Sequence, residues 1–230
     1  MDTAVPGAGG TEYMDSELMD FLRRAKKANL TMVAANIAVF LILSLAGDTL
    51  DARFMLSHGA AYAPYIVTRG EYYRLFTSMF LHFGLTHLLY NMVCLLSLGD
   101  LLETIVGPVR YLVIYLLGGI AGSLLSLFRG LHSEIPAVSA GASGAIFAVI
   151  GALLSIVLRL RNGQSRSMSK RLALMAGLMI LQGFMERGTD NAAHIGGFAA
   201  GFILGMILWR RPRQSGKRDT GAWSDRESMI

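Results

Sequence analysis

The stretch GASGAIFAVIGALLSIVL, residues 141–158, carries no charged side chain and is followed by Arg159. An α-helix needs about 20 apolar residues to cross about 30 Å of hydrocarbon, so this stretch approaches the length of a membrane span. A serine, Ser143, stands near its start. A lone serine in a span usually packs or bonds to its own backbone, so Ser143 gains meaning only from what the fold places beside it.

The composition extends this pattern to the whole chain. Of 230 residues, 53% are hydrophobic and only 16% are charged, a balance typical of membrane proteins. Six apolar runs are candidate spans: 30–46, 85–102, 111–128, 142–158, 172–185 and 192–209. The fifth is the shortest and its edges are the least defined. We predict an all-α membrane protein, a bundle of six transmembrane helices with a long outer loop between the first and second.

The predicted outer loop covers residues 47–81 and is long for so compact a protein. It contains many aromatic side chains, among them Tyr62, Tyr65, Tyr72 and Tyr73. Aromatic side chains favour the boundary between membrane and water. We therefore expect this loop to rest in the interfacial layer.

Basic residues predict the orientation, because short loops rich in Lys and Arg stay in the cytoplasm. Sixteen of the 21 basic residues fall on one side of the predicted bundle: Arg23, Arg24, Lys26, Lys27, Arg110, Arg159, Arg161, Arg166, Lys170, Arg171, Arg210, Arg211, Arg213, Lys217, Arg218 and Arg226. We predict a multi-pass protein of the cell membrane with both termini in the cytoplasm. Orientation accounts for the net charge of +5, and no basic stripe with interleaved aromatics suggests a nucleic-acid partner.

The chain divides into three predicted parts: a cytoplasmic arm at 1–28, a six-span domain at 29–209 and a basic disordered tail at 210–230. The arm fits a short amphipathic helix or a solvated basic segment equally well. It lacks a basic start followed by an apolar core, so we expect no cleaved signal peptide. The single Cys94 excludes an internal disulfide and a zinc site built from cysteines. We expect neither a metal nor an organic cofactor.

Polar side chains are costly in hydrocarbon and are functional candidates by default. The informative ones are His82, His87, Asn91, Ser143 and His194. Three of them stand 16 residues before a charged residue at a cytoplasmic helix end: Ser143 before Arg159, His194 before Arg210, and His87 before Glu103. At about 1.5 Å per residue, all three lie about 24 Å from the inner boundary. One serine and two histidines therefore share a level near the outer face.

Small residues predict which helices approach each other. Gly197, Gly201 and Gly205 repeat every four residues after His194, and Gly144, Ala148 and Ala152 repeat likewise after Ser143. Such rows let helix backbones come close in lipid, so the fourth and sixth spans can bring Ser143 and His194 together. Imidazole has the basicity to accept a serine proton, and the two side chains would form a catalytic dyad.

A second polar pair lies on the second span. His87 and Asn91 are four residues apart, so both can aim donors at one point. Together with the backbone N–H of Ser143 they could stabilise a developing oxyanion. Gly141 and Gly144 supply the backbone freedom that a tight turn and a close approach need.

Three motifs, in this order, closely resemble the signature of the rhomboid intramembrane serine proteases: HFGLTHLLYNM at 82–92, GASG at 141–144 and AHIGGFAAG at 193–201. YYR at 72–74, the FTSMFLHFG run at 76–84 and the 99–103 ending of the second span are also similar to that family. The resemblance covers about residues 30–209. A lone GxSG motif is weak, whereas three ordered motifs are specific.

The resemblance implies that Ser143 is the nucleophile, His194 the general base, and His87 and Asn91 parts of the oxyanion hole, with no Asp in the dyad. Supporting roles fall to Phe147, His82, Gly141, Gly144, Gly197, Arg74 and Glu103. His82 resembles a nearby structural histidine, and Arg74 and Glu103 resemble residues that hold the outer loop and the inner end of the second span. Phe147 stands where several bacterial members have Tyr, which keeps a ring for stacking but loses a hydroxyl. Tyr73 stands where Trp is common.

The function implied is that of a serine endopeptidase, a hydrolase that cleaves transmembrane segments of other proteins near their outer ends, with the lipid bilayer as its solvent. Substrate would enter from lipid past the fifth span and unwind locally. One alternative is a catalytically silent rhomboid-like protein that binds client transmembrane helices, although binding alone needs neither Ser143 nor His194. A small transporter is a second alternative, but the sequence has no inverted repeat.

Overall fold

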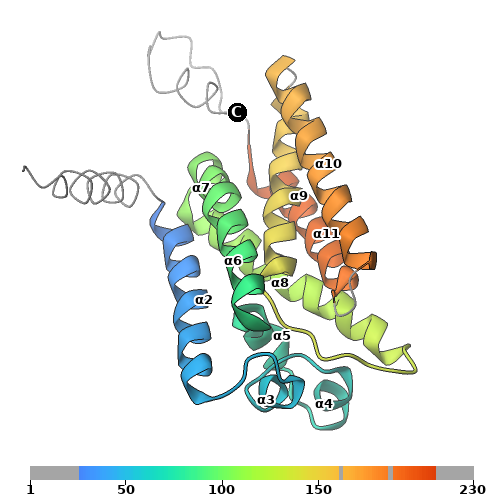
Figure 1. Ribbon diagram of the computed structural model, residues 1–230. Helices are drawn as coiled ribbons and strands as arrows, with labels where there is room; N and C mark the ends of the chain where they lie inside the picture. Colours follow the sequence, from blue (N-terminus) through green and yellow to red (C-terminus); the bar gives the residue numbers. More distant parts are fainter. Residues whose placement is uncertain (1–25, 161–162, 186–188, 211–230) are drawn as a thin grey trace, which may run out of the picture.

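A computed structural model describes residues 26–160, 163–185 and 189–210 (Figure 1). Residues 1–25 of the predicted arm and 211–230 of the predicted tail lie outside it. The described chain folds into these helices: α2 (Lys27–Ala46), α3 (Ala52–Ser57), α4 (Ala63–Thr68), α5 (Arg74–Thr77), η1 (Ser78–Phe80), α6 (Gly84–Cys94), η2 (Leu95–Gly99), α7 (Asp100–Val106), α8 (Pro108–Leu131), α9 (Ser143–Leu160), α10 (Gly163–Met185) and α11 (Asn191–Leu208). The prediction of an all-α bundle is confirmed.

Five spans among the described residues are long and apolar enough to cross a membrane: α2, the continuous helix from α6 through η2 to α7, α8, α9 and α11. Helix α10 has 23 residues but opens with a polar and basic segment, GQSRSMSKR, and so is less apolar than the other five. The sequence predicted an apolar run only at 172–185, and the structure extends that helix by about two and a half turns at its start. The fifth predicted span is therefore long enough but not uniformly apolar.

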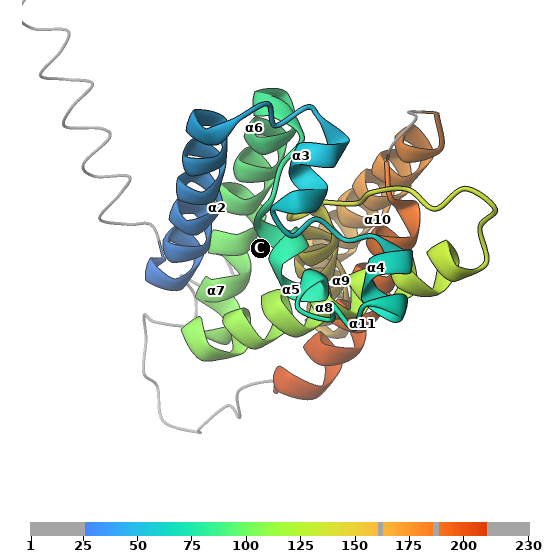
Figure 2. The same cartoon turned by 90° about the horizontal axis from the view of Figure 1, so that it is seen from below.

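Helix α9 is the centre of the bundle. It packs against α8, α10, α11 and η2, and 14 of its 18 residues are buried. Its residues are buried without a break from Gly144 to Leu153, so the buried surface covers all faces of the helix. A helix that is apolar all round is stable only when it is covered on every side. Helix α8 supplies part of that cover by crossing the bundle obliquely (Figures 1 and 2).

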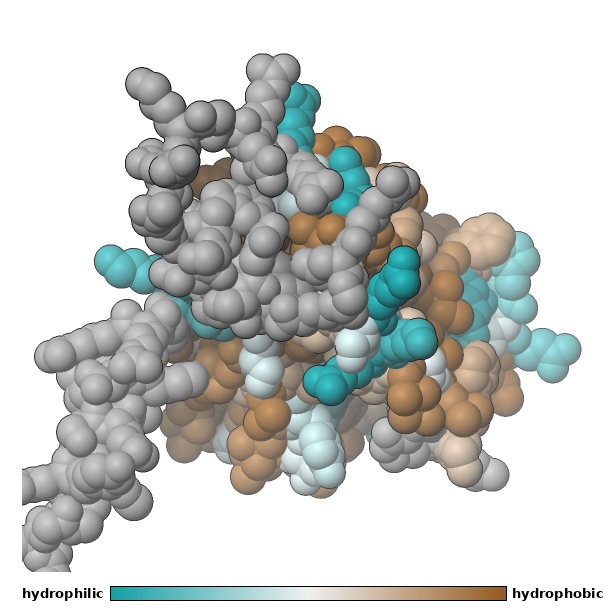
Figure 3. Space-filling model, turned by 90° about the horizontal axis from the view of Figure 1, so that it is seen from above, coloured by the Kyte–Doolittle hydropathy of each residue, from teal (hydrophilic) through white to brown (hydrophobic). Residues whose placement is uncertain are grey.

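The two ends of the bundle differ in composition. The helices α3, α4 and α5 gather at one end, while the start of α2, the end of α9 and the end of α11 lie at the other (Figure 1). Seen from that other end, the described residues are hydrophilic near the tip and hydrophobic on the flanks (Figure 3). Exposed apolar side chains on the flanks include Leu41, Ile42, Leu45, Val93, Leu117, Leu174, Leu178, Ile203 and Met206. Such a belt is the surface that lipid tails solvate.

The loop predicted at 47–81 is built mostly of short helices. Arg74, only 4% exposed, donates from Nη1 to the carbonyl oxygens of Leu56 (2.7 Å) and Ala60 (2.8 Å) and pairs with Glu71 through Nε. One guanidinium thus ties two carbonyl groups of the loop to Arg74. The loop also joins the segment before α9, because Ala61 and Ser139 exchange both backbone hydrogen bonds.

Glu103 lies at the opposite end and contacts the start of α2. Its carboxylate accepts from the backbone N–H groups of Ala28 (3.3 Å) and Asn29 (2.7 Å). The first N–H groups of a helix have no partners within it, and a carboxylate is favourable there. Lys26, at the N-cap position, makes no side-chain capping bond, so Glu103 of α7 caps α2 from outside.

Candidate active site

Ser143 and His194 meet across the contact between α9 and α11. Nε2 of His194 lies 2.9 Å from Oγ of Ser143, although 51 residues separate them in sequence. Ser143 is the first residue of α9, and His194 lies in the first turn of α11. The predicted juxtaposition of the two side chains is observed.

Glycines on α11 make this approach possible. A Cβ added at Gly197 would lie 2.0 Å from the carbonyl oxygen of Gly144, and one added at Gly201 would lie 2.0 Å from that of Ala148. Gly205 is equally close to α9, near Ser155 and Ala152. These distances are far below van der Waals contact, so only glycine fits and the two backbones touch directly. The predicted pairing of the two small-residue rows is confirmed.

The backbone turns sharply just before Ser143. Gly141 has φ of +143°, a conformation that side chains disfavour, and its N–H donates to the carbonyl oxygen of Ser78 (2.9 Å). A Cβ at Gly141 would lie 2.8 Å from Cε1 of His87. The turn therefore brings the start of α9 beside the His87 ring. Ser143 is half-buried there, and a backbone N–H in the first turn of a helix has no partner within that helix.

Stacking and burial define the plane of the His194 ring. Phe147 stacks on it with ring centroids 4.3 Å apart and planes 16° apart. The His194 side chain is buried, and within the described part of the chain no group is hydrogen-bonded to its Nδ1. A carboxylate at that nitrogen orients the histidine of a catalytic triad. The His194 ring has no such carboxylate among the described residues and is packed against the aromatic face of Phe147 instead.

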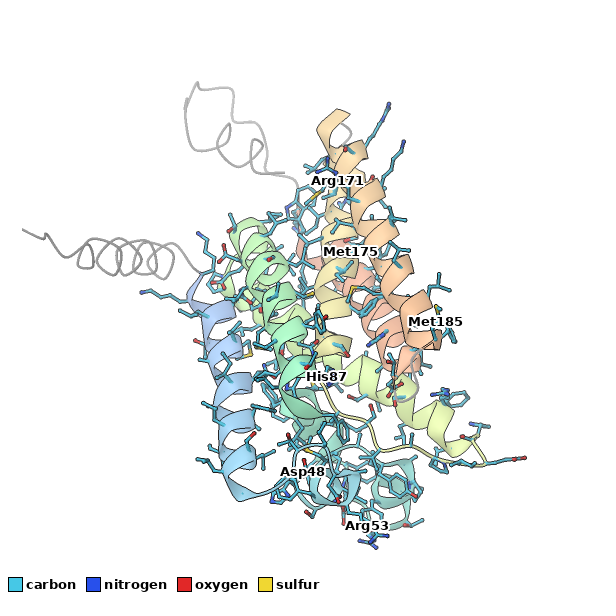
Figure 4. All side chains as sticks on the ribbon, viewed as in Figure 1. Asp48, Arg53, His87, Arg171, Met175 and Met185 are labelled. Atoms are coloured by element: carbon cyan, nitrogen blue, oxygen red, sulfur yellow. The ribbon has the colours of Figure 1, made fainter. Side chains whose placement is uncertain are left out.

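His87 and Asn91 lie on α6, as the sequence predicted. Figure 4 shows His87 between Asp48 near the α3–α5 end and Arg171 near the opposite end. Nδ2 of Asn91 donates to the carbonyl oxygen of His87 (3.0 Å), which uses one of its two N–H donors. The second N–H makes no hydrogen bond within the described part of the chain. His87 therefore contacts the turn at Gly141 directly, while Asn91 is tied to its own helix.

His82 lies next to His87, just before the start of α6. It is 1% exposed, its ring lies edge-on to that of His87 at 5.2 Å, and its Nε2 is 3.4 Å from the backbone nitrogen of Ala142. These contacts join the loop before α6 to the turn that precedes Ser143. They agree with the structural role that the resemblance implied.

Three side chains near the dyad were not singled out from the sequence. Asp190, just before α11, accepts hydrogen bonds from the hydroxyls of Ser126 and Ser139 and from the backbone N–H of Ala193. An Asp immediately before an apolar run is a helix-start signal that could have identified its capping role. Its serine partners come from α8 and from an irregular segment, which no periodicity predicts.

Two observations concern the binding of metals and ligands. Among the described residues no group of three or more His, Cys, Asp or Glu side chains is placed to hold a metal ion. A cavity of about 490 Å³ lies at the far end of α9 from Ser143, lined by Val157, Leu158, Ser165, Arg166 and Ser169. It shares no residue with the dyad or with the α6 pair.

The fold and site define a multi-pass helical membrane protein with a serine and a histidine paired inside its bundle. The Rhomboid domain model matches residues 69–211, more than half of the chain. The protein belongs to the rhomboid family.

Relatives agree with this assignment. The chain is 35% identical over 176 residues to "Rhomboid protease GluP" of Bacillus subtilis, covering 76% of this chain and 34% of that protein. It is 40% identical over 153 residues to "RHOMBOID-like protein 5" of Arabidopsis thaliana, covering 64% and 48%, and 39% identical over 176 residues to "RHOMBOID-like protein 7" of the same plant, covering 75% and 52%. The chain thus spans about a third to a half of the length of these relatives.

Proposed function

We propose that the protein is an intramembrane serine protease in which Ser143 is the nucleophile and His194 the general base. The observation that carries this proposal is the 2.9 Å distance between Ser143 Oγ and His194 Nε2. Such a distance is within the range for proton transfer along a hydrogen bond. The relative named a rhomboid protease supports the same reaction class.

The first half of the reaction forms an acyl-enzyme. The Ser143 hydroxyl donates its proton to Nε2 of His194 while Oγ attacks the carbonyl carbon of the scissile peptide. The resulting tetrahedral intermediate places a negative charge on the former carbonyl oxygen. When it collapses, the C–N bond breaks, and the imidazolium of His194 gives its proton to the leaving amine.

Donors around Ser143 meet the negative charge. In this proposal the donors are the backbone N–H of Ser143, the second N–H of Asn91 and the ring of His87. Donors fixed in advance are effective because they need no reorganisation as charge develops. The contact between His87 and Gly141 holds one of them against the turn that carries Ser143.

The second half of the reaction consumes water. His194 takes a proton from a water molecule, whose oxygen attacks the acyl carbon, and the Ser143 oxygen leaves and regains its proton. Substrate must unwind locally before either half begins, because a helical peptide bond is hydrogen-bonded within its helix. Leaving those groups unpaired in lipid costs several kcal/mol, so unwinding is favoured near a polar site.

The site belongs near the outer face in this proposal. Ser143 starts α9, and the helix ends 17 residues later at Leu160, which spans about 26 Å. The far end carries Arg159, and α10 begins nearby with Arg166, Lys170 and Arg171. Short basic segments stay in the cytoplasm, so the Ser143 end faces outward and both termini are cytoplasmic.

A cleavage assay tests the proposal. The purified protein is reconstituted into liposomes with a reporter transmembrane segment that contains helix-breaking glycines, and cleavage is followed by gel mobility. We expect wild-type cleavage and a loss of about 10⁴-fold or more in Ser143→Ala and in His194→Ala, because the two residues act as one unit. Ser155→Ala is the matched control, since Ser155 is a buried serine of α9 bonded only to Ala152.

A second control separates histidines. His132 is exposed at the end of α8 and bonds only to the Phe128 carbonyl oxygen, so His132→Ala should cleave like wild type. Cleavage that persists in Ser143→Ala would contradict the proposal. Binding of the reporter by a wild-type protein that never cleaves it would favour the client-binding alternative instead.

A further inference from the structure

One carboxylate lies between the two parts of the chain that carry the dyad. Oδ1 of Asp190 accepts from the backbone N–H of Ala193 at 3.1 Å, which caps α11 at its first turn. Oδ2 accepts from the Ser139 hydroxyl at 2.7 Å and from the Ser126 hydroxyl. His194 follows four residues after Asp190, and its N–H donates to the Asp190 carbonyl oxygen at 3.2 Å.

Ser139 is itself fixed on its other side. It precedes Ser143 by four residues, and its N–H and C=O pair with Ala61 at 2.9 and 2.8 Å. Its hydroxyl turns the other way, toward Asp190. The short segment from 139 to 143 is therefore held by the α3–α5 loop through its backbone and by α11 through one side chain.

Ser126 connects a third element, α8, to the Asp190 carboxylate. It lies on α8 one turn after Gly122, where a Cβ would come within 2.6 Å of the Ala193 carbonyl oxygen. Helix α8 thus touches the start of α11 by backbone contact and also by a hydrogen bond to Asp190. The carboxylate joins α8, the segment before α9 and the start of α11.

The dyad needs a fixed connection between the segment before α9 and the start of α11, because no group is hydrogen-bonded to Nδ1 of His194 in the described chain. The position of the ring then depends on where the first turn of α11 sits relative to Ser143. A misplacement of about 1 Å at a catalytic group can cost 10²-fold in rate.

We propose that Asp190 is the positioning residue of the dyad: its carboxylate holds the segment that leads to Ser143 and the helix that carries His194 in one fixed relation. This inference rests on the proposed function of the pair. The Asp190 side chain is hydrogen-bonded to Ser126, Ser139 and Ala193, and to neither the Ser143 hydroxyl nor the His194 ring, so it is a positioning residue and not a catalytic one.

The test measures the rate at which a fluorophosphonate reacts with Ser143, per folded molecule, and the kcat and KM for a reporter transmembrane segment. Asp190→Ala should lower both the labelling rate and kcat by about 10- to 100-fold, with KM nearly unchanged because Asp190 does not touch substrate. Ser139→Ala should lower them by a smaller factor. The double variant should match Asp190→Ala alone, because the Ser139 hydroxyl has no further partner to lose.

Asp190→Asn should restore most of the rate. The amide oxygen can still accept from the Ala193 N–H, and the two amide hydrogens can donate to the two serine oxygens. Three bonds therefore survive, and only the two bonds to the serines reverse their polarity. Asp51→Ala is the matched control: Asp51 caps α3 with the same chemistry, accepting from Arg53 and Phe54, but is bonded to no other helix. Ser133→Ala, whose hydroxyl bonds only to Ile135, is the control for Ser139.

Each outcome decides the matter. If Asp190→Ala reduces only the amount of folded protein and leaves the rate per folded molecule at the wild-type value, the role is merely structural and the inference is wrong. If Asp190→Asn is as slow as Asp190→Ala, hydrogen bonding does not position the dyad and the inference is again wrong. If the wild-type protein does not react at Ser143, the proposed function is wrong, and the inference about Asp190, which rests on it, is wrong as well.

Discussion

Helix α9 has two unlike neighbours, α11 and α10. Toward α11 the contact is between backbones: Cβ atoms added at Gly197 and Gly201 would strike carbonyl oxygens of α9 at 2.0 Å. Toward α10 the contact involves side chains such as those of Leu172 and Ala176. The glycine of α10 at position 177 lies on the exposed face, where an added Cβ would meet nothing within 4 Å. The residues proposed for chemistry lie on the tightly packed side. The close packing of the α9 and α11 backbones, more than the burial of side chains alone, fixes the relative position of Ser143 and His194.

Helix α10 also exposes much of its apolar surface. Leu174, Leu178, Leu181 and Phe184 are each more than half exposed. Few of its residues can therefore be fixed by packing within this chain. The contrast predicts that substitutions on the α11 and α6 sides of α9 change activity strongly, while matched substitutions on α10 do not.

Outside the dyad, the largest effect is expected at the α6 pair, the proposed oxyanion donors His87 and Asn91. His87→Ala and Asn91→Ala should each lower turnover by about 10- to 1000-fold, because a developing oxyanion loses a preorganised donor. Turnover of the reporter segment in liposomes measures the effect, and thermal unfolding should show that both variants remain folded. Ser97→Ala is the control, since Ser97 lies farther along the same long helix and bonds only to Val93. Unchanged turnover would remove the pair from the site.

The next effect compares glycines on the two neighbours of α9. Gly201→Ala should lower the free energy of unfolding by about 1–3 kcal/mol, because its methyl group overlaps Ala148 and forces the backbones apart. Gly177→Ala should be neutral or stabilising by up to about 1 kcal/mol, since alanine favours a helix and the space is open. Denaturant unfolding in detergent measures both. Equal destabilisation by the two substitutions would show that Gly201 of α11 is not more tightly packed than Gly177 of α10.

The smallest effect concerns the ring that covers His194. Phe147→Leu should lower kcat by about 2- to 10-fold, which corresponds to the loss of an aromatic pair worth about 0.5–1.5 kcal/mol. Phe198→Leu is the control, because Phe198 stacks on Phe202 and not on the dyad. A Phe147→Leu variant with wild-type kcat would show that stacking does not orient the histidine.

Much of this arrangement could be predicted from spacing. The four-residue rows on α9 and α11 and the common depth of Ser143 and His194 predicted their meeting, because helical periodicity is regular enough to place side chains from sequence. The small-residue rows carried this inference, and the observed contacts of Gly197 and Gly201 agree with it.

Other features depend on contacts that no periodic pattern encodes. Three contacts join segments far apart in sequence through a few hydrogen bonds: the cap that Glu103 places on α2, the backbone pairing of Ala61 with Ser139, and the bonds of the Asp190 carboxylate. The loop at 47–81 was expected as one interfacial segment, but its short helices are defined by local bonds such as those of Arg74. Such bonds become visible only when the tertiary fold is known.

The central claim is that His194 activates the Ser143 hydroxyl across the α9–α11 contact. Mass spectrometry of the protein after reaction with a fluorophosphonate tests it most directly, because it reports which residue carries the adduct. We expect a single adduct on Ser143 in the wild-type protein and almost none in His194→Ala. An adduct on another residue, or an equal yield on Ser143 without His194, would contradict it.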